Sequence, residues 1–165
     1  MTITINAFDK KSFDSAIKDL NKYKRNLERK TKQLAERLAN YGLLLAQVSF
    51  EGVPYVGHKE VIVTKEPSEN GYIIRASGMT ALILEFGAGV TLGGGHPQAT
   101  DFGMGVGTYP GQKHAFDPNG WYLPRSAGIF AGEHTYGNPP AMAMYNAEKD
   151  MEREIEQMAR EVFEL

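Results

Sequence analysis

The longest pattern in the sequence is an apolar stripe in its first third. Apolar residues recur at alternating intervals of four and three within residues 13–48, and Lys24 and Thr31 are the polar residues at two of these positions. This spacing places the apolar side chains on one face of a helix. Asp9 precedes the stripe and is a candidate N-cap. We therefore predict an N-terminal helix over residues 9–49.

This predicted helix is long for a chain of 165 residues. At 1.5 Å per residue, residues 13–48 would span about 54 Å, which is more than one small core can cover. Part of the helix should therefore project from the domain or pack on a partner. A break near Tyr41 and Gly42 is the competing prediction, because glycine weakens a helix interior by about 1 kcal/mol.

The next apolar runs have the composition of strands. The runs "KEVIVTKEP" and "GYIIRAS" are rich in β-branched residues, and the Asn70-Gly71 pair between them supplies the positive φ angles of a hairpin turn. A third run, "TALILEF", follows within a few residues. Together the runs predict an antiparallel meander over residues 53–86, with Glu85 and Phe86 at the end of its last strand.

The second half of the chain divides into three segments. Residues 87–120 hold ten glycines and predict an extended loop. Residues 121–136 include the run "WYLP" and predict a further strand. Residues 138–165 keep helical spacing, with Asn138 as N-cap and proline in the first turn. This order predicts a single α+β domain over residues 1–165, with a meander of about four strands and the C-terminal helix packed on the sheet.

Charge is divided unevenly along the chain, although the net charge is only −2. Residues 9–40 contain ten Lys and Arg against five Asp and Glu, whereas residues 141–165 contain three against seven. Opposite potentials of this kind suit head-to-tail packing of neighbouring subunits or pairing of the two helices within one chain. Two solvated helix faces of opposite sign are the third interpretation.

Composition excludes several classes of protein. The chain has no cysteine, so disulfides and thiolate metal sites are excluded. Its start, "MTITINAFDKK", lacks the pattern of a signal peptide, and no apolar run approaches the roughly 20 residues that span a bilayer. We expect a soluble protein made in a cytoplasm, with no membrane partner. The near-neutral total also argues against a dedicated nucleic-acid binder.

The residues that could carry catalysis or bind a metal are dispersed. Glu85 could form a carboxylate pair with Asp101, Asp117 or Glu133, but spacing does not show that they converge. No two histidines have the helical spacing of a zinc site, and the glycine-rich runs match no nucleotide-binding motif. We therefore predict no enzymatic activity, no cofactor, no metal and no small-molecule substrate. Four loop residues are the residual metal candidates: His96, Asp101, His114 and Asp117.

Two short motifs, in this order, resemble those of bacteriophage tail-completion or head-tail joining proteins, the neck proteins of long-tailed phages. The first is the end of an apolar run that leads into E-F-G-x-G, with Ala88 where threonine is usual in the family. The second opens the last helix with a glycine, a proline-alanine pair and an apolar tail. The positions that match most directly are Glu85, Phe86, Gly87, Gly89, Gly137, Pro140 and Ala141.

The resemblance implies a structural virion protein with no catalytic residues. Such a protein forms a ring, commonly a hexamer, that joins the capsid portal or connector to the tail tube, as a head-tail joining, tail-completion or tail-terminator subunit. Its expected partners are other copies of itself, the connector or head-closure protein and the tail-tube protein, with non-specific proximity to DNA in the channel. It would be assembled in the bacterial host cytoplasm and located in the virion neck.

We expect the two oppositely charged helices to supply contacts between subunits in such a ring. Two alternatives remain open: a packaging accessory that contacts DNA through the basic N-terminal helix, and a phage-encoded hydrolase built on the loop acids. The candidate contact residues are Lys22, Arg25, Arg29, Lys32, Glu152 and Glu156.

Overall fold

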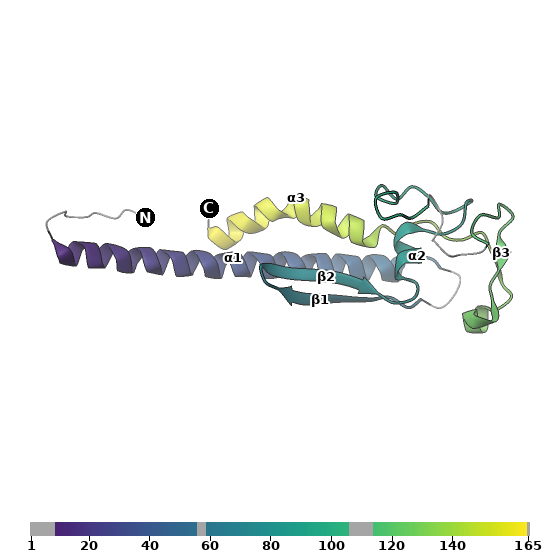
Figure 1. The fold of residues 1–165 in the computed structure, drawn as a ribbon, viewed down its shortest axis with the longest axis horizontal. Helices are drawn as coiled ribbons and strands as arrows, with labels where there is room; N and C mark the ends of the chain where they lie inside the picture. Colours follow the sequence, from purple (N-terminus) through teal and green to yellow (C-terminus); the bar gives the residue numbers. More distant parts are fainter. Residues whose placement is uncertain (1–8, 56–58, 106–113, 165) are drawn as a thin grey trace.

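The computed structural model describes residues 9–55, 59–105 and 114–164, and shows an elongated α+β molecule built along one long helix (Figure 1). The elements in chain order are α1 (Lys10–Gly52), β1 (Ile62–Ser68), β2 (Gly71–Ser77), α2 (Ala81–Phe86), β3 (Trp121–Tyr122), the 3-10 helix η1 (Arg125–Phe130), β4 (His134–Thr135) and α3 (Ala143–Phe163). Residues 106–113 of the predicted loop lie outside the described residues.

Helix α1 confirms the predicted N-terminal helix and runs without interruption for 43 residues, about 64 Å. Its N-cap is Asp9, whose carboxylate accepts the Lys11 backbone N–H at 3.0 Å. Helix α3 lies alongside α1 and ends near Lys30, whose ammonium contacts Glu164 at 2.9 Å. Residues 10–29 of α1 therefore extend beyond the end of α3, as Figure 1 shows. We call this segment the arm.

The competing prediction, a break near Tyr41 and Gly42, is wrong, and Gly42 has a packing role instead. A Cβ atom at Gly42 would overlap the Met151 sulfur of α3 and would lie 2.8 Å from Ile74 Cδ1 of β2. Both α3 and the hairpin thus approach the helix backbone at this point. The missing side chain allows two neighbours to pack closely, which offsets the weak helix propensity of glycine.

The hairpin of β1 and β2 is confirmed, with Ile62 paired to Ser77 at one end and Ser68 to Gly71 at the other. Its turn residues are Glu69 and Asn70, one position earlier than predicted. The hairpin packs against α1. The described residues contain one other sheet, in which β3 pairs with β4 over two residues each.

The predicted four-strand meander is not confirmed, because the run "ALILEF" forms α2 rather than a strand. Its buried residues include Ala81, Leu84 and Glu85, which repeat at the intervals of three and four that a helix produces. A six-residue apolar run does not distinguish a buried strand from a short buried helix, so this error follows from the length of the run. Glu85 and Phe86 therefore lie at the end of a helix.

The C-terminal helix begins later than predicted, at Ala143 rather than at residue 138. Two prolines follow Asn138, and the residue before a proline is disfavoured in helical conformation, so the chain stays extended there. Helix α3 packs along α1 rather than on the sheet. Ion pairs join the two helices, between Lys30 and Glu164 and between Arg37 and Glu161, so the charge asymmetry is used in part within one chain.

The core is small and lies where the C-terminal half of α1 meets β1, α2 and the start of α3. Leu84 is its largest fully buried side chain, and Phe50 packs in the same cluster. The remaining buried members are Ala46, Val63, Ala143 and Ala147. The core thus lies near the C-terminal end of α1, whereas the arm carries exposed apolar side chains.

We expect Gly42→Leu to lower the free energy of unfolding by about 1–3 kcal/mol, because the new side chain would displace Met151 and Ile74. Urea unfolding followed by circular dichroism measures the change. The matched control is Gly52→Leu in the last turn of α1, where a Cβ meets nothing within 4 Å. Equal stability of the two variants would contradict the close packing at Gly42.

Candidate functional site: the Glu85 corner and the adjoining groove

The Glu85 carboxylate caps the beginning of α3 from a distant part of the chain. Its side chain is only 9% exposed. Oε2 accepts the Met144 backbone N–H at 2.9 Å, and Oε1 accepts that of Tyr145 at 3.0 Å. N–H groups in the first turn of a helix lack partners within the helix, and the N-terminus attracts negative charge. Since Met142 provides no side-chain cap, Glu85 performs this function for α3.

His96 is the second side chain on the Glu85 carboxylate. It is buried, and its Nε2 lies 3.3 Å from Glu85 Oε1. Nδ1 accepts the Gln98 backbone N–H at 3.2 Å, so the ring proton of the neutral imidazole belongs on Nε2 and points to Glu85. The ring also packs against Phe86 and Tyr145, with centroids 4.3 and 5.5 Å away. His96 therefore attaches the loop after α2 to the start of α3.

Backbone hydrogen bonds fasten the same corner. The Ala141 N–H donates to the Leu84 carbonyl at 2.7 Å, and the Met142 N–H donates to the Glu85 carbonyl at 3.2 Å. These carbonyls belong to the last turn of α2, where intrahelical donors are missing. The C-terminal end of α2 is thus satisfied by the segment that leads into α3.

Two glycines allow the backbones to approach closely at this corner. Gly87 and Gly137 have φ angles of 80° and 94°, which other residues rarely adopt. A Cβ on Gly137 would overlap the carbonyl oxygen of Ala88, and one on Gly87 would lie 2.9 Å from Pro140 N. Between them, Ala88 and Asn138 form an isolated antiparallel bridge. Larger residues at either glycine would force the two segments apart.

The structure thus brings together the two motifs that carry the family resemblance. Glu85 contacts the first turn of α3, and Phe86 is buried beside His96. From the sequence, Glu85 is a motif residue and a candidate for a carboxylate pair, and His96 is only a metal candidate, so their contact with each other and with α3 is not predicted. The motif residues that meet at or beside this corner are Glu85, Phe86, Gly87, Gly89, Gly137, Pro140 and Ala141.

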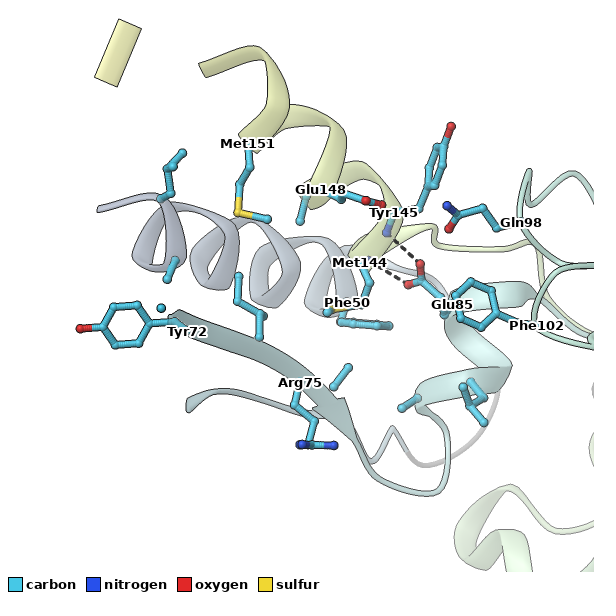
Figure 2. A pocket seen from close by; sticks show the side chains of 18 of the residues that line it. Phe50, Tyr72, Arg75, Glu85, Gln98, Phe102, Met144, Tyr145, Glu148 and Met151 are labelled. Carbon is cyan, nitrogen blue, oxygen red and sulfur yellow. Dashed lines mark hydrogen bonds between the residues drawn. The ribbon is translucent and has the colours of Figure 1, made fainter. Parts of the chain in front are cut away.

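An apolar groove of about 830 Å³ adjoins the corner. Ala35 and Ala39 of α1 line it, together with side chains from β2, α2 and α3. Figure 2 shows Glu85 and Phe102 at one end and Tyr72 toward the other. Glu148 contributes a carboxylate to its lining and forms no ion pair within the described part of the chain.

The charged residues predicted as subunit contacts are not brought together within one chain. Glu152 pairs with Lys149 at 2.8 Å and Glu156 with Arg160 at 2.6 Å, both within α3. Arg29 donates to Asn26. The three remaining side chains, those of Lys22, Arg25 and Lys32, are exposed on α1.

The ion pairs between α1 and α3 involve residues that sequence reasoning did not single out. The hydrogen bond from Arg37 lowers the pKa of Glu161, and the hydrogen bond from Lys30 lowers the pKa of Glu164. The carboxylates of Glu161 and Glu164 are exposed, so the contribution of these ion pairs to stability is small. Which residues pair depends on the register between α1 and α3, and the periodicity of each helix alone does not determine that register.

Among the described residues, no group of three or more His, Cys, Asp or Glu side chains could hold a metal ion. His96 is bound to Glu85, and the Asp117 carboxylate accepts the Asn119 N–H at 2.9 Å. No helix in residues 9–55, 59–105 and 114–164 is long and apolar enough to cross a membrane.

Comparison with known proteins does not assign a family to this chain. No protein-family model matches it, and neither the curated proteins nor the solved structures include a significant match. Inference about function therefore rests on the corner, the groove and the arm.

We expect Glu85→Gln to lower the free energy of unfolding by about 1–2 kcal/mol, because a carboxamide offers one oxygen where the carboxylate offers two to α3 and His96. Urea unfolding measures the loss. Glu69→Gln is the matched control, since Glu69 is exposed in the hairpin turn. Unchanged stability of the Glu85 variant would show that the negative charge is not needed to cap α3.

Proposed function

We propose that this protein is a structural subunit that assembles with other copies of itself. The observation that carries the proposal is the arm, a single helix whose large apolar side chains are about half exposed. Contiguous exposed apolar surface of this kind marks interaction sites in soluble proteins. The exposed fractions are 43% for Phe13, 56% for Ile17, 51% for Leu20, 51% for Tyr23 and 44% for Leu27.

We further propose that the assembly is the neck of a long-tailed phage, where the chain forms a ring between the capsid connector and the tail tube. The motifs that resemble the neck proteins support this assignment, and they are also the residues of the Glu85 corner. An elongated subunit suits such a ring because its two ends present different surfaces. Different surfaces on one subunit allow head-to-tail contacts, which close into rings when the rotation permits.

Light scattering after size exclusion should show a mass above that of one 18.3 kDa chain at high concentration. Negative-stain microscopy should then show rings, either alone or at the neck when tails or capsids are added. Assembly is expected to weaken on dilution, because the association of separate copies depends on their concentration. A monomer at every concentration, with no ring and no attachment to tails or capsids, would contradict the proposed function.

Contact with DNA is the second candidate function, and one observation favours it. Lys18, Lys22, Arg25 and Arg29 recur every three or four residues, so they share the face of the arm opposite its apolar stripe. None of them forms an ion pair within the described residues. Such a row can contact phosphates without reading sequence.

If the basic row binds DNA, affinity for duplex DNA should fall steeply as salt rises. The Lys22→Gln/Arg25→Gln variant should then reduce the slope of log affinity against log salt by about two. Fluorescence anisotropy at several salt concentrations measures the slope. Arg125→Gln in η1 is the control because Arg125 is an exposed base outside α1. Absence of salt-dependent binding would contradict the DNA role and would leave the assembly proposal intact.

A further inference from the structure

The arm and the groove are two apolar surfaces on different parts of the same chain. We propose that the arm of one copy lies in the groove of the next copy and that this contact is the repeating interface of the assembly. The inference rests on the proposed self-assembly, but it names the two surfaces that meet. The role of each surface can be tested whether or not the copies form a closed ring.

The arm has the side-chain spacing of a helix that binds in a groove. Its exposed apolar residues follow one another at intervals of four, three, three and four, which keeps them on one face. Helices that bind grooves present anchors with this repeat. The five anchors are Phe13, Ile17, Leu20, Tyr23 and Leu27.

The groove has a matching form. Its lining includes the small side chains Ala35 and Ala39 on α1, with Tyr72 from the hairpin and Met151 from α3. Helix α3 is 21 residues long, about 31 Å, and the 20-residue arm is about 30 Å. The α3 residues that line the groove lie within 144–151, a span of about 12 Å, so about two turns of a neighbouring arm can lie in the groove while the rest of the arm continues along α3.

The arm cannot reach the groove of its own chain. Ala35, Leu38 and Ala39 line the groove and belong to α1, as does the arm. Because α1 is a continuous helix, the arm points away from the groove along the same axis (Figure 1). An arm that occupies the groove must therefore come from a second copy of the chain.

Charge favours the arm and α3 as partners. The arm contains seven Lys and Arg against three Asp and Glu, and α3 contains six acids against three bases. Lys24 lies within the apolar face of the arm, where its ion pair with Glu28 is long, at 3.9 Å, and exposed. Glu148 lines the groove and has no ion pair in the described residues, so it offers Lys24 a carboxylate.

Pairing of two arms with each other is the competing arrangement. It would bring two positively charged helices together and would leave both grooves open. Repulsion between like charges opposes it, whereas the arm and α3 attract one another. An arm in a groove also uses two different patches and so propagates from copy to copy, as a ring requires.

Disulfide trapping between two variants tests the contact, since the natural chain contains no cysteine. A Lys24→Cys chain is mixed with a Glu148→Cys chain at concentrations where the unmodified protein assembles, and mild oxidation follows. We expect the mixed dimer to dominate over dimers of either variant alone. Ile129→Cys replaces Glu148→Cys in the control, because Ile129 is 91% exposed in η1, outside the groove. A dominant dimer of Lys24→Cys with itself, or no preference over the control, overturns the inference.

A second test exchanges the charges of Lys24 and Glu148 and, separately, places a polar residue in the apolar face of the arm. Lys24→Glu and Glu148→Lys should each weaken assembly, and the double variant should recover most of it. Leu20→Gln should weaken assembly on the order of tenfold, whereas Asn21→Gln, away from the stripe, should not. Analytical ultracentrifugation measures the dissociation constants, and circular dichroism confirms folding.

The outcomes separate the inference from the proposed function. Rings that form equally well with Leu20→Gln and with both single charge variants would overturn the arm and groove contact while leaving self-assembly in place. A chain that never assembles under any condition would overturn both.

Discussion

The hydrogen bonds from the first turn of α3 to the Glu85 carboxylate are the interaction on which this structure depends. A buried carboxylate is costly unless its oxygens are satisfied, and the N–H groups of Met144 and Tyr145 satisfy both. The helix benefits equally, because its own N-cap residue supplies no side-chain acceptor. The same interaction fixes where α3 begins and therefore how its acidic face lies along α1. One wall of the groove is thus held by a residue from the end of α2.

Helix α1 supports the rest of the molecule. Helix α3 and the hairpin both pack on it, and Gly42 lets their side chains approach its backbone at one point. The core around Leu84 and Phe50 lies toward the C-terminal end of α1, so the N-terminal arm contributes little to burial. A helix of 43 residues is therefore longer than the core needs. The excess length makes sense if the arm is stabilised by another molecule.

The sequence predicts the local elements better than their partners. The stripe in residues 13–48 spans many turns, so its period identifies a helix, but it does not show whether that helix breaks near Gly42. The run that becomes α2 is only six residues long, too short for its period to decide between strand and helix. Asparagine is common at helix N-caps, yet the backbone of Asn138 pairs with that of Ala88. Because two prolines follow it, α3 begins further along the chain, at Ala143. Contacts such as that of Glu85 with α3 depend on how separate elements pack, and the local pattern of one sequence does not show this packing.

The corner also bears on how copies would fit together. In the proposed contact, the arm and the groove floor belong to one rigid helix, so the angle between successive copies is set by how an arm lies between α3 and β2. Displacing α3 would change that angle and therefore whether the series of contacts closes. The Glu85 and His96 hydrogen bonds hold α3 at its N-terminal end, while Lys30 and Arg37 hold it near its C-terminal end. The residues that resemble a family motif would thus act through geometry: they fix the wall against which the next subunit packs.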